Sequence, residues 1–360
     1  MSELLAREAI VRRAFHRQAA ACLSLGSPFT ARLCTLVAAR LQDTHPVGRA
    51  ILSWPGEPSP DGDSVPLRFA GTLHALVLAN DALELAAVYP PHADVSDDDR
   101  WAAVDFACRH KVDFILDRLT SAPQTNEVRR SAALLPGFLT IASLLRKPMV
   151  LSEVGASAGL NLQWDKYDYR LGKAAWGTQT SQVVIAPEWK GGLPPQVQVD
   201  VESRAGCDLN PLNPADSKDI LRLMSYIWPD QPERLQRTAA ALAVAAESRQ
   251  TVEKADAVDW LDRRLTTTYP GSVHVIYHTI AWQYLPMALQ TKGEALIAVA
   301  GDRATVDAPL ARLQMEADGQ EKGAALTLQI WPSGERHLIG RADFHGRWVD
   351  WIGWRGATGA

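Results

Sequence analysis

The sequence predicts an α/β protein in which a mostly parallel sheet follows an all-helical N-terminal domain. Up to residue 146, apolar residues recur at spacings of three and four, which is typical of amphipathic helices. From residue 147 onward, short apolar runs bounded by glycine or proline alternate with helical stretches. This alternation predicts parallel strands with helices on both faces. We therefore expect a helical domain over residues 1–146 and an α/β domain over residues 147–360.

The expected elements follow from these periodicities and from the turn residues between them. Pro332-Ser333-Gly334 forms a tight turn between the last two strands, so these strands should pair as an antiparallel hairpin. The expected helices are 2–24, 29–42, 67–88, 98–120, 126–146, 215–248, 257–266 and 281–291. The expected strands are 148–153, 197–202, 251–255, 272–278, 294–300, 324–331 and 335–344.

Composition and charge argue against several classes of protein. The formal net charge of −4 argues against general affinity for nucleic acid or for a membrane surface. No apolar run reaches the roughly 18 residues of a membrane-spanning helix, and the N-terminus lacks the apolar stretch of a signal peptide. The four cysteines are scattered without a CxxC pair, as in a reduced cytoplasmic protein. We expect a cytoplasmic protein with a small-molecule substrate and leave its oligomeric state open.

A glycine-containing turn follows the first expected strand. The run has an acidic residue and then a small residue at every second position, which lets the backbone approach a ligand closely. A helix starting after the turn would offer free N–H groups to a carboxylate. This pattern is typical of the first motif of S-adenosylmethionine-dependent methyltransferases. The residues expected to bind that cofactor here are Glu153, which would hold the amino group of its methionine part, with Gly155, Ser157, Gly159 and Asn161.

Two other interpretations of this turn stay open. Gly155-Ala-Ser157-Ala-Gly159 also matches the G-x-S-x-G elbow of a serine hydrolase. The later triad members would then be Asp302 or Asp307 with His337 or His345. A tight turn without a ligand is the third interpretation. The dinucleotide fingerprint is excluded, because serine and leucine stand where its second and third glycines would be.

Carboxylates after later strands extend the cofactor hypothesis. Glu202 or Asp208 would bind the ribose hydroxyls, and Asp256 would bind the adenine amino group. The alternatives are a solvated turn carboxylate or a helix cap for the first two. For Asp256 the alternative is an N-cap of the following helix, which does not exclude the adenine contact. Thr279 follows the strand 272–278, at the edge where open sheets bind ligands, and is expected to contact the cofactor.

Proton transfer is expected at the end of the same strand. Alternation places His274, Ile276 and His278 on one face, and His278 has a suitable ordinary pKa for a general base. Tyr284 and His345 are the other candidates for this role. A packed, hydrogen-bonded histidine is the alternative for His278. The two strand histidines lack a third ligand, so no metal site is expected.

Substrate-binding residues are expected outside the cofactor motif. Asn126, Arg129 and Arg130 could bind an anionic group. A helix cap with solvated arginines is the alternative for them. Aromatic and amide side chains could line the substrate pocket and stabilise the sulfonium, with core packing as their alternative. These side chains are Trp164, Tyr167, Tyr169, Trp282 and Gln283.

With these residues assembled, the chain resembles a bacterial family known only as domain of unknown function 2332, over nearly its whole length. The segments that carry the resemblance are Gly26-Ser-Pro28, Thr125-Asn-Glu-Val128 with Arg130, Glu153 to Gly159, Gly206-Cys-Asp208, Trp228-Pro-Asp-Gln231, His278 with Gln283-Tyr284, and His345-Gly346. The family resembles the methyltransferase superfamily in its sheet and first motif. This resemblance implies a Rossmann-like, methyltransferase-type sheet ending in an antiparallel hairpin.

The leading hypothesis is therefore an S-adenosylmethionine-dependent methyltransferase acting on a small or medium-sized molecule. Residues 147–360 would bind the cofactor, and the helices of residues 1–146 would cover the substrate. A serine hydrolase that uses Ser157, and a binding protein that has the fold but no catalysis, are the alternatives. Serine at position 157, where a methyltransferase more often has glycine, keeps these alternatives open.

Overall fold

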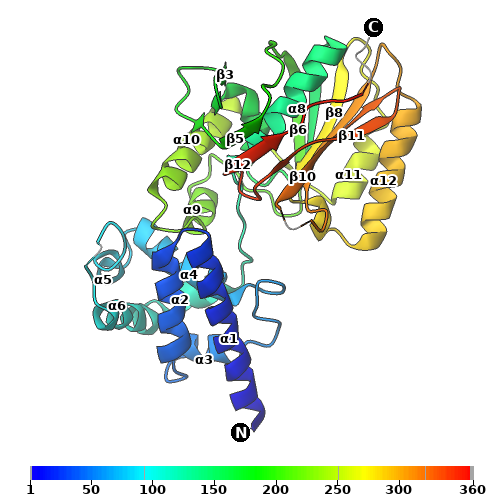
Figure 1. The fold of residues 1–360 in the computed structure, drawn as a ribbon. Coiled ribbons are helices and arrows are strands. Elements are labelled where there is room, and N and C mark those ends of the chain that lie inside the picture. Colours follow the sequence, from blue (N-terminus) through cyan, green and yellow to red (C-terminus); the bar gives the residue numbers. More distant parts are fainter. Residues whose placement is uncertain (1, 93, 250, 321, 357–360) are drawn as a thin grey trace. The chain divides into compact units, whose positions relative to one another are not determined.

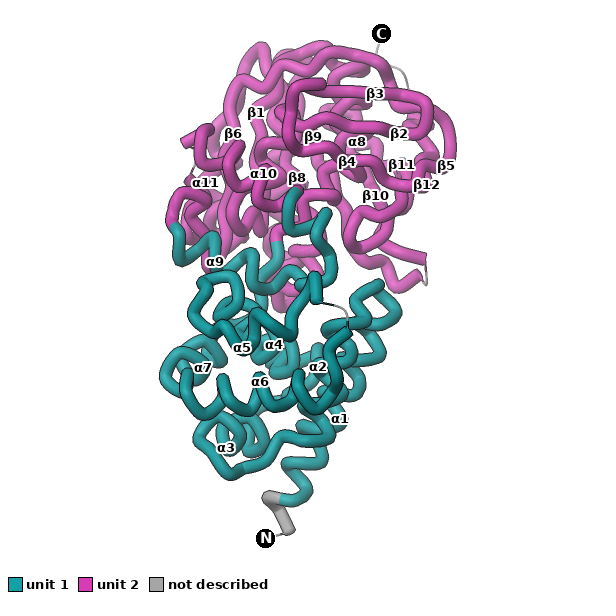
Figure 2. Tube along the Cα trace, turned by 90° about the vertical axis from the view of Figure 1, so that its left-hand side faces the viewer, with its two compact units in different colours: residues 1–125, 217–236 teal, residues 126–216, 237–360 magenta. Residues whose placement is uncertain are grey.

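The computed structural model describes residues 2–92, 94–249, 251–320 and 322–356. It divides into two compact units (Figure 2). Unit 1 contains residues 1–125 and 217–236, and unit 2 contains residues 126–216 and 237–360. This division differs from the expected boundary after residue 146, because the helix α8 (Arg130–Leu145) belongs to unit 2 and a later segment belongs to unit 1.

Unit 1 is helical in its described residues, as the apolar spacing predicts. The expected helix 67–88 is interrupted near Asn80, whose φ of +54° is left-handed, and the expected helix 98–120 is interrupted at Lys111. The helices are α1 (Ser2–Ser24), α2 (Pro28–Arg40), α3 (Pro46–Leu52), α4 (Val65–Leu78), α5 (Leu83–Ala86), α6 (Asp97–His110), α7 (Val112–Leu119) and α9 (Ser217–Ser225). The helix α10 (Pro232–Ser248) begins in unit 1 and ends in unit 2.

Two of the segments that carry the family resemblance, Gly26-Ser-Pro28 and Trp228-Pro-Asp-Gln231, meet inside unit 1. Ser27, the N-cap of α2, donates its hydroxyl to the Asp230 carboxylate at 2.5 Å. The backbone N–H of Phe29 donates to the other carboxylate oxygen at 2.8 Å. Gln231 also donates to the Leu25 carbonyl at 3.4 Å. These bonds attach the segment 217–236 to the start of α2, which explains why the compact unit includes it.

Unit 2 is built on a nine-stranded sheet with the order β5-β12-β11-β10-β9-β8-β1-β6-β7 (Figure 1). Five neighbouring strands are parallel, and β9 to β12 are antiparallel to one another. Counted along the chain, the parallel strands have the order 3-2-1-4-5, as in doubly wound sheets. The strands are β1 (Met149–Val154), β5 (Glu188–Gly191), β6 (Val201–Asp208), β7 (Glu253–Lys254), β8 (Val273–Thr279), β9 (Leu310–Glu316), β10 (Ala324–Trp331), β11 (Glu335–Ala342) and β12 (Trp348–Trp351). A separate three-stranded sheet contains β2 (Asp168–Leu171), β3 (Ala174–Gly177) and β4 (Val184–Ile185).

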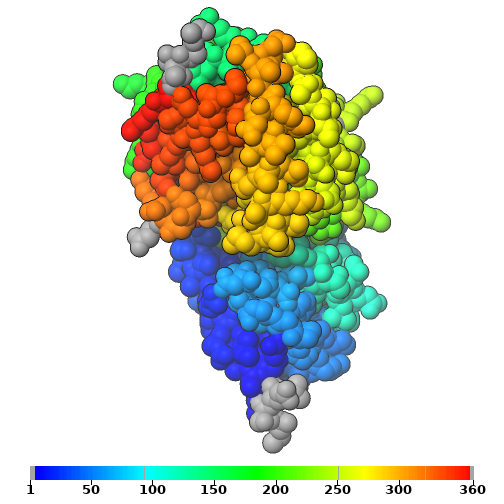
Figure 3. Space-filling model, turned by 90° about the vertical axis from the view of Figure 1, so that its right-hand side faces the viewer, coloured from blue at the N-terminus to red at the C-terminus, as the bar shows by residue number. Residues whose placement is uncertain are grey.

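Helices cover both faces of the large sheet. The helix α8 packs on one face, where a Cβ added to Gly137 would lie 2.4 Å from the Leu313 side chain of β9. The helices α11 (Ala257–Arg264) and α12 (Met287–Asp302) pack against each other on the other face. In the space-filling view, α12 forms the outer surface of this layer with the α11 region beside it (Figure 3). The sheet is therefore the middle layer of three, as the alternation of strands and helices predicts.

The structure confirms the expected hairpin and corrects two of the expected strands. The antiparallel pair β10 and β11 flanks the predicted turn. The expected strand 294–300 is wrong, because this apolar run lies inside α12, and a short apolar run alone does not distinguish helix from strand. The expected strand 197–202 is also misplaced, since β6 begins at Val201 and ends at Asp208. The strand β9 was not expected, because buried polar residues interrupt its apolar pattern.

Candidate functional site

The candidate site lies where β1 and β8 end, at the reversal of the strand order. Ligands of open α/β sheets bind at this point, beyond the carboxyl ends of the strands. Val154 at the end of β1 is paired with His278 near the end of β8. The glycine turn follows β1 directly, and the segment after β8 lies next to it. We call the side of the sheet where β1, β6, β7, β8 and β9 end the carboxyl edge.

The glycine turn has an unusual backbone. Gly155, Ser157 and Gly159 have φ values of +72°, +52° and +71°. A serine in the left-handed region is uncommon, and such residues concentrate at functional sites. The expected α-helix after the turn is absent: the turn leads instead into a 3₁₀ helix, η1 (Asn161–Lys166). The predicted strand and turn are therefore present, but a 3₁₀ helix stands where the start of an α-helix was predicted.

Protein acceptors occupy the amide groups of this turn. The N–H groups of Gly155 and Ala156 donate to the Cys207 carbonyl at 2.9 and 3.0 Å. The N–H of Ser157 donates to the Asp208 carboxylate at 2.9 Å. The turn is thus attached to the end of β6, and a ligand carboxylate would have to replace these acceptors to reach its amides.

Asn126 supports the same turn from a remote part of the chain. Its buried side-chain oxygen accepts from the N–H groups of Ala158 and Leu160 at 3.2 and 3.1 Å. The expected helix cap is wrong, because α8 begins at Arg130 and has Arg129 at its N-cap position. Asn126 is engaged by the turn, so in this structure it is not presented to a substrate.

Arg130 joins three segments at the carboxyl edge. Its guanidinium donates to the Phe344 carbonyl at 2.9 Å and to the Thr279 carbonyl at 3.3 Å. A Cβ added to Gly346 would lie 2.5 Å from the Arg129 carbonyl oxygen, so the loop after β11 packs closely on the start of α8. In the same loop, the N–H of His345 donates to Asp343 at 3.0 Å. The structure thus brings the expected substrate segment next to the end of β8 and to the loop that contains His345.

Glu153 lies beneath the turn and is 1% exposed. Burial raises the pKa of its carboxyl well above the usual value, although a hydrogen bond from Tyr277 opposes this shift. Tyr277 lies 3.4 Å from the Glu153 carboxyl and also reaches the Asn161 carbonyl at 3.3 Å. Burial therefore disfavours the charged form of Glu153, the residue expected to hold the cofactor's amino group. The side-chain oxygen of Asn161 is buried and has no hydrogen-bond partner within the described residues.

The structure places two of the three carboxylates expected to bind the nucleoside at the carboxyl edge, since Asp208 ends β6 and Asp256 follows the neighbouring strand β7. Asp208 lies at the carboxyl edge, where its other oxygen accepts from the Asn210 N–H at 2.8 Å. Glu202 lies at the opposite end of β6 and accepts from Ser272, so its expected ribose contact is wrong. Asp256 accepts from the N–H groups of residues 258 and 259 at 2.8 and 3.2 Å, so it is the N-cap of the following helix. This role does not exclude its expected adenine contact, which stays a prediction.

His278 is fully buried beside β9. Its Nδ1 lies 2.6 Å from the Glu316 carboxylate, and its Nε2 lies 3.2 Å from nitrogens of Arg312 and Gln314. Burial lowers its pKa, although the hydrogen bond to Glu316 opposes the shift. Trp282 stacks on the imidazole with ring centroids 4.9 Å apart. Both ring nitrogens are engaged, so the packed histidine describes His278 better than an accessible general base.

Glu316 and Arg312 are the residues of this network that sequence reasoning missed. Glu316 also accepts from the N–H groups of Ala281 and Trp282 at 3.0 and 3.1 Å. Burial raises its pKa, but these bonds and the bond from His278 outweigh burial and keep the pKa below the usual value. Arg312 is 1% exposed and pairs with Glu294 of α12. The sequence did contain a signal for this strand. Polar residues stand at every second position of Arg312-Leu-Gln314-Met-Glu316, and a period of two is typical of a strand.

The remaining candidates are packed or exposed. Tyr167 is buried and donates to the Leu160 carbonyl at 2.5 Å, and Trp164 stacks on Phe138 with centroids 4.1 Å apart. Core packing is therefore the role that the structure shows for Tyr167, Trp164 and the buried Tyr169. Gln283 accepts from the N–H of residue 317 at 3.2 Å, and Tyr284 is 75% exposed.

The triad expected for a serine hydrolase is not assembled. Ser157 follows the carboxyl end of β1, whereas Asp307 pairs at 3.3 Å with Lys147, which precedes β1. Asp302 ends α12 near the start of β9, and His337 lies at the start of β11 beside Glu335. A six-residue strand spans about 20 Å, which is too far for a hydrogen-bonded triad. His345 is the one expected partner that lies at the carboxyl edge.

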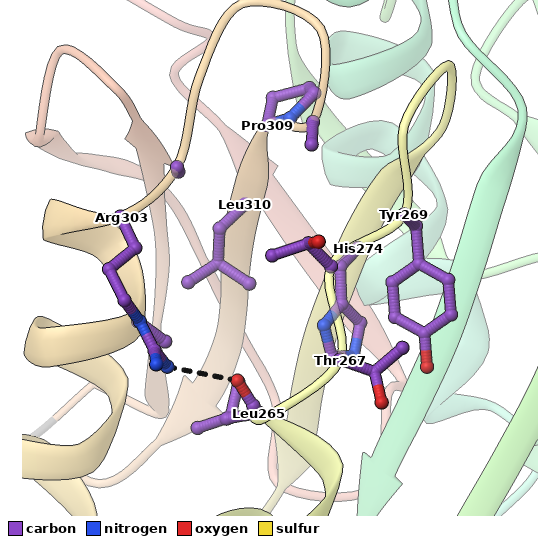
Figure 4. Close-up of a pocket in the computed structure, with 11 residues that line it drawn as sticks. Leu265, Thr267, Tyr269, His274, Arg303, Pro309 and Leu310 are labelled. Atoms are coloured by element: carbon purple, nitrogen blue, oxygen red, sulfur yellow. Dashed lines mark hydrogen bonds between the residues drawn. The ribbon is translucent and has the colours of Figure 1, made fainter.

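A small pocket lies at the other end of the sheet, at the starts of β8 and β9 (Figure 4). It has a volume of about 30 Å³, and Tyr269, His274 and Leu310 are among its lining residues. Arg303 closes one side by donating to the Leu265 carbonyl at 3.0 Å. This volume holds roughly one water molecule, so the pocket does not accommodate a nucleoside cofactor.

His274 makes this end of the sheet sensitive to acid. Its Nε2 lies 2.8 Å from the Ser152 hydroxyl, and burial, with Arg264 nearby, lowers its pKa from 6.5 to about 3. The unfolded chain therefore binds a proton first as the pH falls. Stability from this group is complete above pH 6.5 and is lost between pH 6.5 and about 3. In urea titrations, replacing His274 with Gln should flatten the pH dependence by up to about 1.4 kcal/mol per pH unit. An unchanged slope would contradict this assignment.

Among the described residues, no group of three or more His, Cys, Asp or Glu side chains is arranged to hold a metal ion. No helix among the same residues is long and apolar enough to cross a membrane.

Comparison with known proteins identifies a family. No curated protein and no solved structure matches the chain. One family model matches residues 12–351, a span that includes most of the helical unit, the glycine turn and the antiparallel strands. The family is described as an uncharacterized protein conserved in bacteria (DUF2332). Since the match covers nearly all of the 360 residues, this chain is a member of that bacterial family.

Proposed function

We propose that unit 2 binds S-adenosylmethionine at the carboxyl edge and transfers its methyl group to a small or medium-sized molecule. The observation that carries this proposal is the parallel strand order 3-2-1-4-5 with a glycine turn at the end of β1, where the order reverses. A nucleoside ligand of such a sheet binds at this reversal. Asp208 at the end of the neighbouring strand supports the same position.

The residues present fit the cofactor in part. Asp208 has a carboxylate at the edge, and the buried Asn161 oxygen lacks a protein donor within the described residues. Asp208 would accept the ribose hydroxyls with lone pairs that its two backbone donors leave open. When bound, S-adenosylmethionine supplies an electrophilic methyl group, so the protein's task is mainly to place the acceptor in line. His345 and Tyr284 remain candidates to take a proton from the acceptor, because His278 is engaged on both ring nitrogens.

Calorimetric titration tests the proposal directly. The full chain is titrated with S-adenosylmethionine and S-adenosylhomocysteine, and we expect dissociation constants below about 1 mM. Replacing Asp208 with Asn should weaken binding about tenfold, because one charge-assisted hydrogen bond contributes about 1.5 kcal/mol or more. Replacing Glu202 with Gln is the matched control, since Glu202 lies at the opposite end of the same strand, and it should leave binding unchanged.

Each other outcome has a definite meaning. If neither ligand binds the wild-type chain at about 1 mM, the cofactor hypothesis is rejected. If the Glu202 variant loses as much affinity as the Asp208 variant, the ligand does not occupy the carboxyl edge. If both ligands bind but no acceptor is methylated, the protein is a binding protein with the same cofactor site.

A further inference from the structure

The segment after β8 lies directly against the glycine turn. We call residues 279–285 the β8 exit loop. A Cβ added to Gly155 would lie 2.5 Å from the Cβ of Ala281, so the loop and the turn are in close contact. Ile280 has a φ of +49°, and a left-handed β-branched residue is a strained outlier. The loop therefore covers the turn in a conformation that its own sequence disfavours, and other groups must hold it there.

Glu316 holds the loop at its start. A single carboxylate oxygen accepts from the N–H groups of Ala281 and Trp282 at 3.0 and 3.1 Å. The same oxygen lies 2.6 Å from Nδ1 of His278. The N–H of Ile280 donates to the Met315 carbonyl at 2.8 Å, which places the strained residue beside β9. One oxygen thus binds both the imidazole and the backbone of the exit loop.

The chemistry of its neighbours sets the protonation state of His278. Arg312 can only donate, and its Nη2 lies 3.2 Å from Nε2 of His278. Nε2 must therefore accept, so the ring hydrogen sits on Nδ1 and is donated to Glu316. The side-chain nitrogen of Gln314, also at 3.2 Å, is consistent with the same arrangement. These hydrogen bonds can form together only when the His278 imidazole is neutral.

A second proton on His278 would disrupt this arrangement. It would place a positive N–H against the Arg312 guanidinium, which pairs with Glu294 of α12 and lies 4.7 Å above the Trp282 ring. The charged groups that face His278 are Glu316 and Arg312 on β9 and Glu294 on α12, with Arg336 of β11 near Glu294. On β8 itself, His274 lies four residues before His278 on the same face, with Ile276 between them. The imidazolium could remain only by rotating away from Arg312. Because opposite charges attract, the Glu316 carboxylate would follow the rotated ring and leave its present position.

We propose that Glu316 is a positioning residue that couples the protonation of His278 to the conformation of the β8 exit loop. With neutral His278, Glu316 holds Ala281 and Trp282, and the loop covers Gly155. With protonated His278, the carboxylate leaves the loop amides, the strain at Ile280 is released and the glycine turn becomes accessible. The link to cofactor access depends on the proposed function, whereas the motion of the loop does not.

Hydrogen exchange of the ligand-free, full-length chain tests the coupling. Exchange of peptides covering residues 279–285 is measured at pH 7.5 and 5.5, with times scaled for the intrinsic exchange rate. We expect these amides to exchange about tenfold faster at pH 5.5 after scaling, because local opening exposes them. Peptides from α6 in unit 1, which contains none of the residues of this network, serve as the internal control and should not change. Equal scaled rates in the loop at both pH values would overturn the proposal.

Variants separate the coupling from a general loss of structure. His278→Asn retains a donor near the Nδ1 position but cannot be protonated, so its loop should exchange equally at both pH values. His337→Asn is the matched control, since His337 also contacts a glutamate, at 3.2 Å, and this variant should keep the wild-type response. If His278→Asn does not fold, Glu316→Ala decides: it removes the acceptor oxygen, so its loop should exchange at the fast rate at both pH values. A pH response that persists in either variant overturns the coupling.

The experiment distinguishes this inference from the proposed function. It uses no cofactor, so failure to bind S-adenosylmethionine leaves the loop response intact. A loop that does not respond to pH, in a chain that binds the cofactor, rejects the coupling alone.

Discussion

Replacing Gly155 with Ala should lower the free energy of unfolding by about 3 kcal/mol. A left-handed backbone costs a residue with a Cβ about 1–2 kcal/mol, and overpacking adds about 1–3 kcal/mol. Both terms apply here, because Gly155 has a φ of +72° and its added Cβ would lie 2.5 Å from that of Ala281. The measurement is urea denaturation followed by tryptophan fluorescence, which reports mainly on unit 2.

Two variants separate the cost of the left-handed backbone from the cost of overpacking. Gly271 has a φ of +82° and no atom within 4 Å of an added Cβ, so Gly271→Ala should lose only the backbone term, about 1 kcal/mol. Combining Gly155→Ala with Ala281→Gly removes the clashing methyl group and should recover about 1 kcal/mol or more as a coupling energy. Equal losses at the two glycines and no recovery in the double variant would show that the loop does not press on the turn.

Replacing Asn126 with Ala should lower the free energy of unfolding about as much as Gly155→Ala does. Its side-chain oxygen is the acceptor for two amides of the turn, those of Ala158 and Leu160. Each buried donor left without a partner costs about 1–3 kcal/mol, so the free energy of unfolding should fall by about 3 kcal/mol. Denaturation by urea gives this value. The turn should lose its conformation, and any cofactor affinity of the chain should fall with it.

Asn126→Asp is the matched control. It keeps an oxygen at the position of the acceptor and replaces the amide nitrogen with a second oxygen, so the turn should keep its shape and the chain should lose about 1 kcal/mol or less. If the Ala and Asp variants are equally destabilised, the loss comes from packing or from charge, and the acceptor is not what holds the turn.

The periodicity of the sequence predicted much of the secondary structure. Apolar spacing located the helices of unit 1, and the turn Pro332-Ser333-Gly334 located the hairpin of β10 and β11. Prediction failed where a short segment was ambiguous. The run 294–300 is apolar in either conformation, and only its continuity with the preceding residues makes it part of α12. Polar Arg312 and Gln314 disguised β9, because buried polar strand residues are rare without partners.

The glycine turn was predicted in position, whereas the contacts that hold it were not. Gly155, Ser157 and Gly159 do form a turn at the carboxyl edge, since small residues were needed there for steric reasons. Glu202 was assigned to the wrong end of its strand, because the start of β6 was predicted too early. Glu316 was missed, because its role depends on the pairing of β8 with β9.

The sequence by itself determined that short apolar strands alternate with helices and that a glycine turn follows the first of them. These properties depend on neighbouring residues, whose spacing can be read directly. Only the tertiary structure decided which side chains hold that turn. Asn126 and Asp208 reach it from segments 32 and 51 residues away, and Glu316 meets His278 from 38 residues away. Such contacts are set by strand order and register, which arise from burial across the whole sheet and leave no local pattern.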